Sequence, residues 1–161
     1  MNQVLLLLGS NLGDRLAHLE FACSAIESCM GMVVRKSQVY ETEAWGNTSL
    51  SGFLNRALLV QTELQPLALL DQILDIEKRM GRIRNEKWEA RMIDIDILFY
   101  NTEIIKEERL EIPHPLMHLR KFCLIPAIEL LPLYIHPVSM NSLSDLLLAC
   151  EDSLSVKPFV K

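Results

Sequence analysis

The chain has 161 residues, of which 50% are apolar and 23% are charged, and its formal net charge is −5. This length fits one domain with a substantial core, and the acidic balance argues against general binding to nucleic acid or to an anionic membrane. Five basic residues still form a local cluster: Arg79, Arg82, Arg84, Lys87 and Arg91. A positive cluster in an acidic protein favours a defined anionic ligand over a long polyanion.

The cysteines and the N-terminal residues indicate the compartment. Cys23, Cys29, Cys123 and Cys150 have no CxxC spacing, which is typical of buried reduced thiols rather than of disulfides or zinc ligands. The apolar run at residues 4–8 is too short for a signal peptide or a membrane span, and it has no basic flank. We therefore expect a cytoplasmic protein that does not associate with a membrane.

The first half of the chain alternates between strand and helix patterns. Residues 4–8 predict a buried strand, and Asp14 is placed to cap a following helix. Residues 33–40 predict a second strand, and the Gly, Asn, Thr and Ser content of residues 41–52 predicts a long loop. Residues 53–63 predict a third strand.

The second half completes the fold prediction. Pro66 favours the start of a helix, and a strand pattern follows over residues 92–98. Further helices are predicted over residues 120–130 and 143–150, and the tail from residue 151 is expected to be loosely held. The order β-α-β-β-α-β predicts that the whole chain is a single α+β domain of the ferredoxin-like type, an antiparallel sheet with flanking helices.

Residues 92–98 hold the clearest signal for chemistry. Because side chains of a strand alternate between its faces, the isoleucines are predicted in the core and Asp94 and Asp96 on the other face, roughly 7 Å apart. Mg²⁺ prefers one or two carboxylates together with water and phosphate oxygens, so this pair predicts a magnesium site. The alternative is a sheet whose second face is solvated, although aspartate is depleted in strands and two on one face repel each other.

The basic cluster precedes this strand directly. Guanidinium groups bind phosphate in a bidentate way and stay charged at any working pH, so Arg82, Arg84 and Arg91 predict an anion site. A solvated basic loop is the alternative, and two glutamates in the same stretch partly favour it. Trp88 instead favours a loop that closes over a substrate and excludes water.

His114 lies between two prolines. Their stiff backbone can aim the imidazole at a fixed point, for example a phosphate oxygen, and Arg109 and Arg120 flank it in the sequence. A structural hydrogen bond is the alternative function for a lone histidine.

The aromatic residues raise the prospect of a heterocycle site. Phe53 and Phe122 could sandwich a flat ring, and Asn55 could both donate to its edge and accept from it. Core packing is the default explanation for a phenylalanine. The sequence contains neither GxxxxGK[ST] nor GxGxxG, which argues against a P-loop or a dinucleotide fold.

Taken together, these segments resemble the 6-hydroxymethyl-7,8-dihydropterin pyrophosphokinase family of folate biosynthesis. The matching segments, in the family's order and spacing, are Gly9-Ser10-Asn11, Tyr40-Glu41-Thr42, Gly46, Phe53-Leu54-Asn55, Glu77, Gly81-Arg82-Ile83-Arg84, Trp88, the run from Arg91 to Leu98, Pro113-His114-Pro115, Arg120 and Phe122. They cover about residues 4 to 137, and the arginine–DxD block together with Pro-His-Pro is the specific part. The resemblance implies a ferredoxin-like fold and transfer of the β,γ-pyrophosphoryl group of ATP to the hydroxymethyl oxygen of the pterin, with release of AMP.

The resemblance also implies roles for individual residues. Catalytic roles fall to Arg82, Arg91, Asp94 and Asp96, and the two aspartates would hold two Mg²⁺ ions. ATP contacts fall to Glu77, Arg84, Trp88, Ile97, Arg109, His114 and Arg120. Pterin contacts fall to Thr42, Glu43, Trp45, Phe53, Asn55 and Phe122. ATP and the reduced pterin are the expected partners, with no nucleic acid and no membrane, and we expect a monomer.

Two departures from the family pattern bear on loops rather than on the reaction. The family usually has proline where Ala44 stands, and Gly-Pro where this chain has Glu89-Ala90. We expect these changes to alter loop closure and nucleotide affinity.

Two other functions remain open at this point. Another DxD metal enzyme, such as a nucleotidyltransferase or a phosphohydrolase, would share Asp94 and Asp96 but would not need Asn55 between flanking aromatic residues. A ferredoxin-like regulatory domain that senses a small ligand would have no use for two strand carboxylates beside several arginines.

Overall fold

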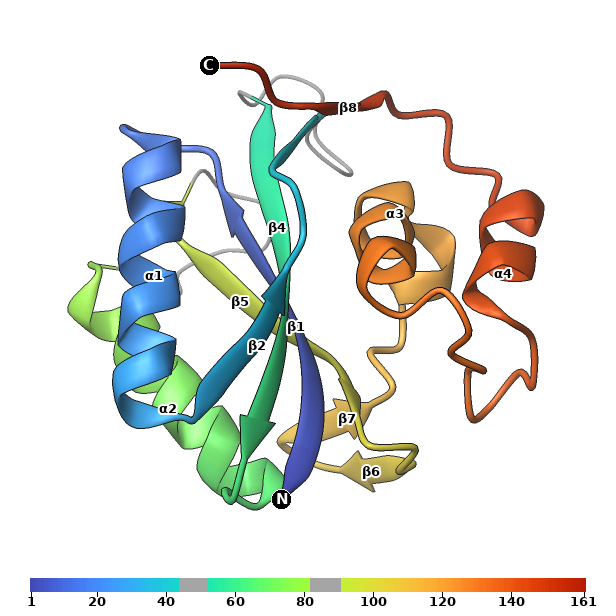
Figure 1. Ribbon diagram of the computed structural model, residues 1–161, viewed down its shortest axis with the longest axis horizontal. Helices are drawn as coiled ribbons and strands as arrows, with labels where there is room; N and C mark the ends of the chain where they lie inside the picture. Colours follow the sequence, from blue (N-terminus) through green and yellow to red (C-terminus); the bar gives the residue numbers. More distant parts are fainter. Residues whose placement is uncertain (44–51, 82–90) are drawn as a thin grey trace.

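The central layer of the fold is an antiparallel sheet with the strand order β5-β1-β4-β3-β8, in which β2 also pairs with β4 (Figure 1). Its strands are β1 (Asn2–Ser10), β2 (Met32–Lys36), β3 (Tyr40–Thr42), β4 (Phe53–Thr62), β5 (Asp94–Tyr100) and β8 (Val156–Pro158). The computed structural model describes residues 1–43, 52–81 and 91–161. The predicted ferredoxin-like α+β fold is confirmed, with the second predicted strand divided into β2 and β3.

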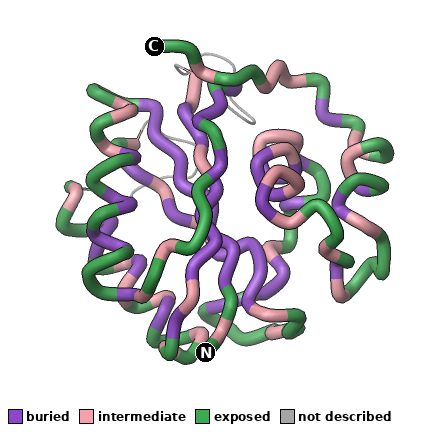
Figure 2. Tube along the Cα trace, in the orientation of Figure 1, coloured by how far each residue is buried: buried purple, intermediate pink, exposed green. Residues whose placement is uncertain are grey.

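Helices cover both faces of this sheet (Figure 1). On one face lie α1 (Arg15–Cys29) and α2 (Pro66–Arg79), and on the other lie α3 (Lys121–Leu130) and α4 (Leu143–Ala149). In β1, Val4, Leu6 and Leu8 are buried in the core with α1 and α2, whereas Leu5 and Leu7 are buried in the core with α3 and α4. The continuous apolar run thus belongs to a strand that is covered on both faces, and Figure 2 shows the central strands buried between the helical layers. A solvated second face is therefore wrong for most of the sheet.

Local sequence signals set the ends of the first two helices. The side chain of Asp14 accepts a hydrogen bond from Ala17 N at 3.0 Å, which confirms the predicted cap. Pro66 occupies the first turn of α2, where its missing N–H has no helical partner to lose. Gly81 follows the end of α2 with a φ of 85°, a conformation that glycine adopts without strain.

The middle of the chain departs from the prediction in two places. Residues 33–40 do not form one strand, because β2 ends before Ser37, whose hydroxyl accepts a hydrogen bond from Ala57 N and replaces the ladder there. The chain resumes pairing at β3, which spans the last residue of the predicted strand and the first two residues of the predicted loop. Between β5 and α3, the strands β6 (Ile105–Glu107) and β7 (Leu110–Ile112) form an antiparallel hairpin that was not predicted, because each has too few residues for a periodic pattern.

The C-terminal segment was expected to be loosely held, and this is also wrong. β8 pairs antiparallel with β3, with Thr42 opposite Val156 and Tyr40 opposite Pro158. Phe159 N also donates a hydrogen bond to Val39 O at 2.8 Å. The attachment depends on backbone pairing across the whole chain, which a local pattern does not reveal.

The cysteines and the helix lengths complete the outline. All four cysteines are free, as predicted, but only Cys23 and Cys123 are buried, and Cys29 is exposed. Among the described residues, none of the helices combines the length and the apolar character needed to cross a membrane.

Candidate active site

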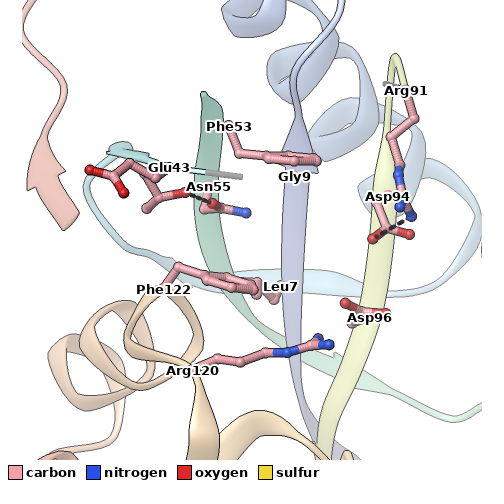
Figure 3. Close-up of a pocket in the computed structure, with 11 residues that line it drawn as sticks. Leu7, Gly9, Glu43, Phe53, Asn55, Arg91, Asp94, Asp96, Arg120 and Phe122 are labelled. Atoms are coloured by element: carbon pink, nitrogen blue, oxygen red, sulfur yellow. Dashed lines mark hydrogen bonds and ion pairs between the residues drawn. The ribbon is translucent and has the colours of Figure 1, made fainter. Parts of the chain in front are cut away.

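One pocket in the described structure brings together most of the predicted site residues (Figure 3). It lies where the ends of β1, β4 and β5 meet the first turn of α3. Its lining consists of Leu7, Gly9, Thr42, Glu43, Phe53, Asn55, Arg91, Asp94, Asp96, Arg120 and Phe122. Residues from both halves of the chain therefore meet in one site.

Asp94 and Asp96 line one wall of the pocket from β5 (Figure 3). The predicted alternation is confirmed, since both aspartates are partly exposed while the isoleucines that alternate with them are buried on the side of α1 and α2. Antiparallel pairing with β1 sets Asp94 opposite Gly9 and Asp96 opposite Leu7. The two carboxylates thus lie on one face of the sheet, beside a floor that β1 provides.

Glu77 of α2 supports this strand from behind. Its side chain is buried, and its Oε1 accepts a hydrogen bond from Ile95 N at 2.9 Å. A buried carboxylate needs such partners to offset its lost hydration. The contact attaches α2 to the part of β5 that carries both aspartates.

Arg91 is held between β5 and the end of β1. Its Nη1 lies 3.1 Å from Asp94 Oδ2, an ion pair drawn in Figure 3. Its backbone N–H donates to Asn11 Oδ1 at 2.7 Å, and its carbonyl accepts from Asn11 N at 3.1 Å. The sequence prediction gave the side chain of Asn11 no role, although the Gly9-Ser10-Asn11 turn after the apolar run was the available signal.

His114 approaches the second carboxylate, with its Nε2 3.9 Å from Asp96 Oδ1. Burial, assisted by the charge of Arg120, lowers the pKa of His114 to about 4, although the charge of Asp94 opposes this. Leu116 N donates to His114 Nδ1 at 3.1 Å. The neutral ring therefore carries its proton on Nε2 and presents an N–H donor on the side of Asp96.

Arg120 supplies a second guanidinium to the pocket. Only 7% of the residue is exposed, and its side chain extends toward Asp96 (Figure 3). Its Cζ lies 5.6 Å from the ring centroid of Phe122, close enough for a cation–π contact. Arg120 and Phe122 both belong to the start of α3, so one helix end carries a cation and an aromatic ring into the same pocket.

The opposite part of the pocket is an aromatic gap. Phe53 from β4 and Phe122 from α3 extend into the pocket from different sides, with Asn55 between them (Figure 3). Thr42 Oγ1 donates to Asn55 Oδ1 at 2.8 Å, and Asn55 Nδ2 donates to Leu8 O at 3.3 Å. These bonds fix the orientation of a carboxamide whose donor and acceptor groups can read the edge of a flat ligand.

Gly9 keeps the floor of this gap open. A Cβ at this position would lie 2.8 Å from Asn55 Nδ2 and 3.5 Å from Phe53 Cδ1. The first distance is below a normal contact, so a side chain here would displace the carboxamide. The sequence prediction noted Gly9 only as part of a turn.

The donor set fits a hydrated divalent cation. Within residues 1–43, 52–81 and 91–161, no group of three or more His, Cys, Asp and Glu residues is arranged to hold a metal by itself. Mg²⁺ does not require one, because it is commonly held by one or two carboxylates and completes its shell with water and substrate phosphate. Two partly exposed carboxylates beside two arginines have this character.

The comparisons with known proteins agree with this chemistry. The family model described as 7,8-dihydro-6-hydroxymethylpterin-pyrophosphokinase (HPPK) matches residues 5–132. The chain belongs to this family. It is 38% identical over 159 residues to the 2-amino-4-hydroxy-6-hydroxymethyldihydropteridine pyrophosphokinase of Aquifex aeolicus, which covers 99% of this chain and 96% of that protein. It is 40% identical over 124 residues to the enzyme of the same name from Bacillus subtilis, covering 76% of this chain and 74% of that protein.

Solved structures support the fold of this HPPK family member. A crystal structure of HPPK-DHPS in complex with substrates matches with a TM-score of 0.74 at 18% identity, over 92% of this chain and 43% of that chain. The Plasmodium falciparum HPPK-DHPS matches with a TM-score of 0.72 at 21% identity, over the same shares. This chain spans less than half the length of those solved proteins, so the likeness concerns their fold over that part.

Some predicted site residues lie elsewhere. Arg109, predicted to contact ATP, lies in the turn between β6 and β7, is ion-paired with Asp71, and is not part of the pocket lining. Ile97 is not part of the pocket lining; its side chain is buried in the core and its backbone pairs with Leu6 of β1. The following predicted positions lie outside the described residues: Trp45, Arg82, Arg84 and Trp88, and the departures at Ala44 and Glu89-Ala90.

Proposed function

We propose that this pocket is the site at which the chain transfers the pyrophosphoryl group of ATP to 6-hydroxymethyl-7,8-dihydropterin, giving the pterin diphosphate and AMP in folate biosynthesis. One observation carries the proposal: a gap between two aromatic rings, edged by a fixed carboxamide, opens beside two carboxylates and two guanidinium groups. A flat heterocycle and a chain of phosphates can therefore lie side by side.

The aromatic gap is the pterin subsite in this proposal. Phe53 and Phe122 stack on the two faces of the bicyclic ring. Asn55 bonds the ring edge, and the backbone around Thr42 and Glu43 bonds the remaining polar atoms. In this orientation the hydroxymethyl group faces the wall formed by β5.

The charged wall is the ATP subsite. Arg91 and Arg120 bind phosphate oxygens, and Arg91 exchanges its ion pair with Asp94 for the more highly charged phosphate. His114 stays neutral and donates from Nε2, so it adds a hydrogen bond without adding charge. Fixing the hydroxyl and the phosphate chain in line is the main catalytic contribution that such a site can make.

Asp94 and Asp96 would hold two Mg²⁺ ions. When bound, these ions neutralise phosphate charge and favour ionisation of the attacking hydroxyl. In the reaction the pterin oxygen bonds to the β-phosphorus, the bond from that phosphorus to the α,β-bridging oxygen breaks, and the hydroxyl proton is released. Among the pocket-lining residues, Asp96 is our candidate for accepting that proton.

The remaining predictions concern parts or properties outside this geometry. Catalytic and ATP-binding roles for Arg82, Arg84 and Trp88, and a pterin contact at Trp45, follow from the family resemblance. Further ATP contacts at Glu77, Ile97 and Arg109 have the same basis. We also propose that the whole chain acts as one monomeric domain in the cytoplasm.

The deciding experiment incubates the protein with ATP, Mg²⁺ and the reduced hydroxymethylpterin, and follows the nucleotide products. AMP that forms only when the pterin is present supports the proposal. Release of ADP, or turnover without the pterin, would instead point to the other DxD enzymes considered above. Ligand binding with no turnover at all would favour a regulatory domain.

A further inference from the structure

The C-terminal segment, residues 151–161, has no role in the proposed chemistry, yet it contacts two elements that carry residues of the aromatic gap, β3 and α3. Through β8 it pairs with β3, which carries Thr42. Through Asp152, three residues after the end of α4, it contacts the first turn of α3, which carries Phe122. Figure 1 shows this segment leaving α4 and joining the sheet edge at β8.

Asp152 is the only described residue of this segment that is buried, with 7% of its surface exposed. Its Oδ2 accepts a hydrogen bond from Lys121 N at 2.9 Å, and its Oδ1 accepts one from Leu154 N at 3.0 Å. One carboxylate therefore joins the α3 end to the turn that leads into β8. A buried carboxylate in such a place is stable because both of its oxygens are hydrogen-bonded.

The start of α3 requires a cap from another part of the chain. The first N–H groups of a helix have no partner within the helix, and the N-cap residue here is Arg120, whose side chain donates hydrogen bonds but accepts none. Asp152 provides the acceptor for Lys121, and its negative charge lies at the positive end of the helix dipole. Lys121 is flanked by Arg120 and Phe122, so the cap fixes the backbone between two pocket residues.

We propose that Asp152 is a positioning residue for pterin binding: by capping α3 from the C-terminal segment, it holds the ring of Phe122 opposite Phe53 and the guanidinium of Arg120 beside the carboxylates. This inference rests on the proposed function, because it needs the aromatic gap to be the pterin subsite. Without the cap the first turn of α3 frays, and the gap is no longer preformed before the ligand arrives.

Three variants test this role. Asp152→Ala removes both acceptors, and Asp152→Asn keeps one side-chain oxygen for two N–H donors. The matched control is Ser142→Ala, because Ser142 caps α4 by accepting from Asp145 N at 3.1 Å, on the same side of the sheet but outside the pocket lining. Pterin binding is measured by calorimetry with Mg²⁺ and a non-hydrolysable ATP analogue, below the melting temperature of every variant.

We expect the pterin Kd to rise about tenfold in Asp152→Ala, about the effect of one lost helix cap, and by less in Asp152→Asn. Ser142→Ala should lower the melting temperature and leave the pterin Kd within twofold of the parent. An unchanged pterin Kd in Asp152→Ala overturns the inference, as does an equal rise in Ser142→Ala, because either result makes Asp152 a purely structural cap. If Asp152→Ala does not fold, Asp152→Asn decides the question on the same terms.

Phe122→Ala, measured in the same way, separates this inference from the proposed function. If that variant binds the pterin as tightly as the parent, the aromatic gap is not the pterin subsite and both proposals fail. If Phe122→Ala weakens binding and Asp152→Ala does not, only the positioning role of Asp152 fails.

Discussion

The two halves of the pocket are built from different interactions. Around the aromatic gap, Thr42 and Asn55 are joined by a hydrogen bond of 2.8 Å and are both buried. Along β5, Asp94 and Asp96 are partly exposed; Arg91 Nη1 lies 3.1 Å from Asp94 Oδ2, and His114 Nε2 lies 3.9 Å from Asp96 Oδ1. The gap is therefore shaped before the ligand binds, whereas the charged wall consists of pairs that an anionic ligand and a cation can exchange.

Contacts between the β3 region and α3 add to the rigid half of the pocket, which is the part around the aromatic gap. Tyr40 of β3 donates its hydroxyl to Glu129 Oε2 at 2.8 Å, and Gln38 N donates to Glu129 Oε1 at 3.0 Å. Burial, with the hydrogen bond and charge of Glu129, raises the pKa of Tyr40 to about 12, so Tyr40 remains a donor at neutral pH. Contacts thus hold α3 at both of its ends: Glu129 bonds Gln38 and Tyr40 near the C-terminal end, and Asp152 bonds Lys121 at the N-terminal end.

The largest expected effect on activity comes from the charged wall, the half of the pocket whose ion pairs a ligand can exchange. Asp96→Ala removes a proposed metal ligand and should lower kcat for AMP formation by at least about 100-fold. Because Asp96 is partly exposed on a strand whose other face is buried, the melting temperature should stay near that of the parent. Near-normal turnover by Asp96→Ala would reject the metal assignment.

Asn55→Ala should give the next largest effect, and on binding rather than chemistry. It removes the proposed contact to the pterin edge, and Thr42 Oγ1 and Leu8 O each lose their hydrogen bond to the Asn55 side chain. We expect the KM for the pterin to rise on the order of 100-fold, with the KM for ATP changed far less. Equal rises in the KM for the pterin and the KM for ATP would show that the aromatic gap and the charged wall do not act independently.

Gly9→Ala tests whether the gap is preformed. The added methyl would meet Asn55 Nδ2, so we expect a rise in the pterin Kd of about tenfold and little change in ATP affinity, both measured by calorimetry. Met80→Ala, outside the pocket lining, is a control for a general loss of packing. A pterin Kd that stays at the parent value would mean that the rigid half adapts more readily than its hydrogen bonds indicate.

The smallest effect concerns the pH dependence of stability in the metal-free protein. The folded pKa of His114 is about 4, below the ordinary value of 6.5, so unfolding takes up a proton between these values. The associated stability is present above pH 6.5 and is lost as the pH falls toward 4, at most about 3 kcal/mol. The free energy of unfolding, measured with urea in EDTA, should fall less between pH 7 and pH 4.5 for His114→Asn than for the parent. An equal fall in the free energy of unfolding for His114→Asn and the parent would mean that the imidazole is more hydrated than its burial indicates.

Local patterns predicted much of the fold and one half of the site. The alternation in residues 92–98 placed Asp94 and Asp96 on one face of a strand, since the period of two is a property of any strand. Asp14 and Pro66 marked helix starts for equally local reasons. The short strands β6, β7 and β8 escaped prediction, and β3 was predicted only at Tyr40, because three residues show no period.

The sequence by itself determined which chemistries are present and the order of the elements: acidic strand, basic cluster, aromatic residues and a ferredoxin-like alternation. Only the tertiary structure decided that Phe53 and Phe122 share one pocket, that Glu77 supports β5, and that Asp152 caps α3. These contacts join residues far apart in the chain. Their partners are chosen by how the sheet and both helical layers pack, and no pattern within a short window carries that information.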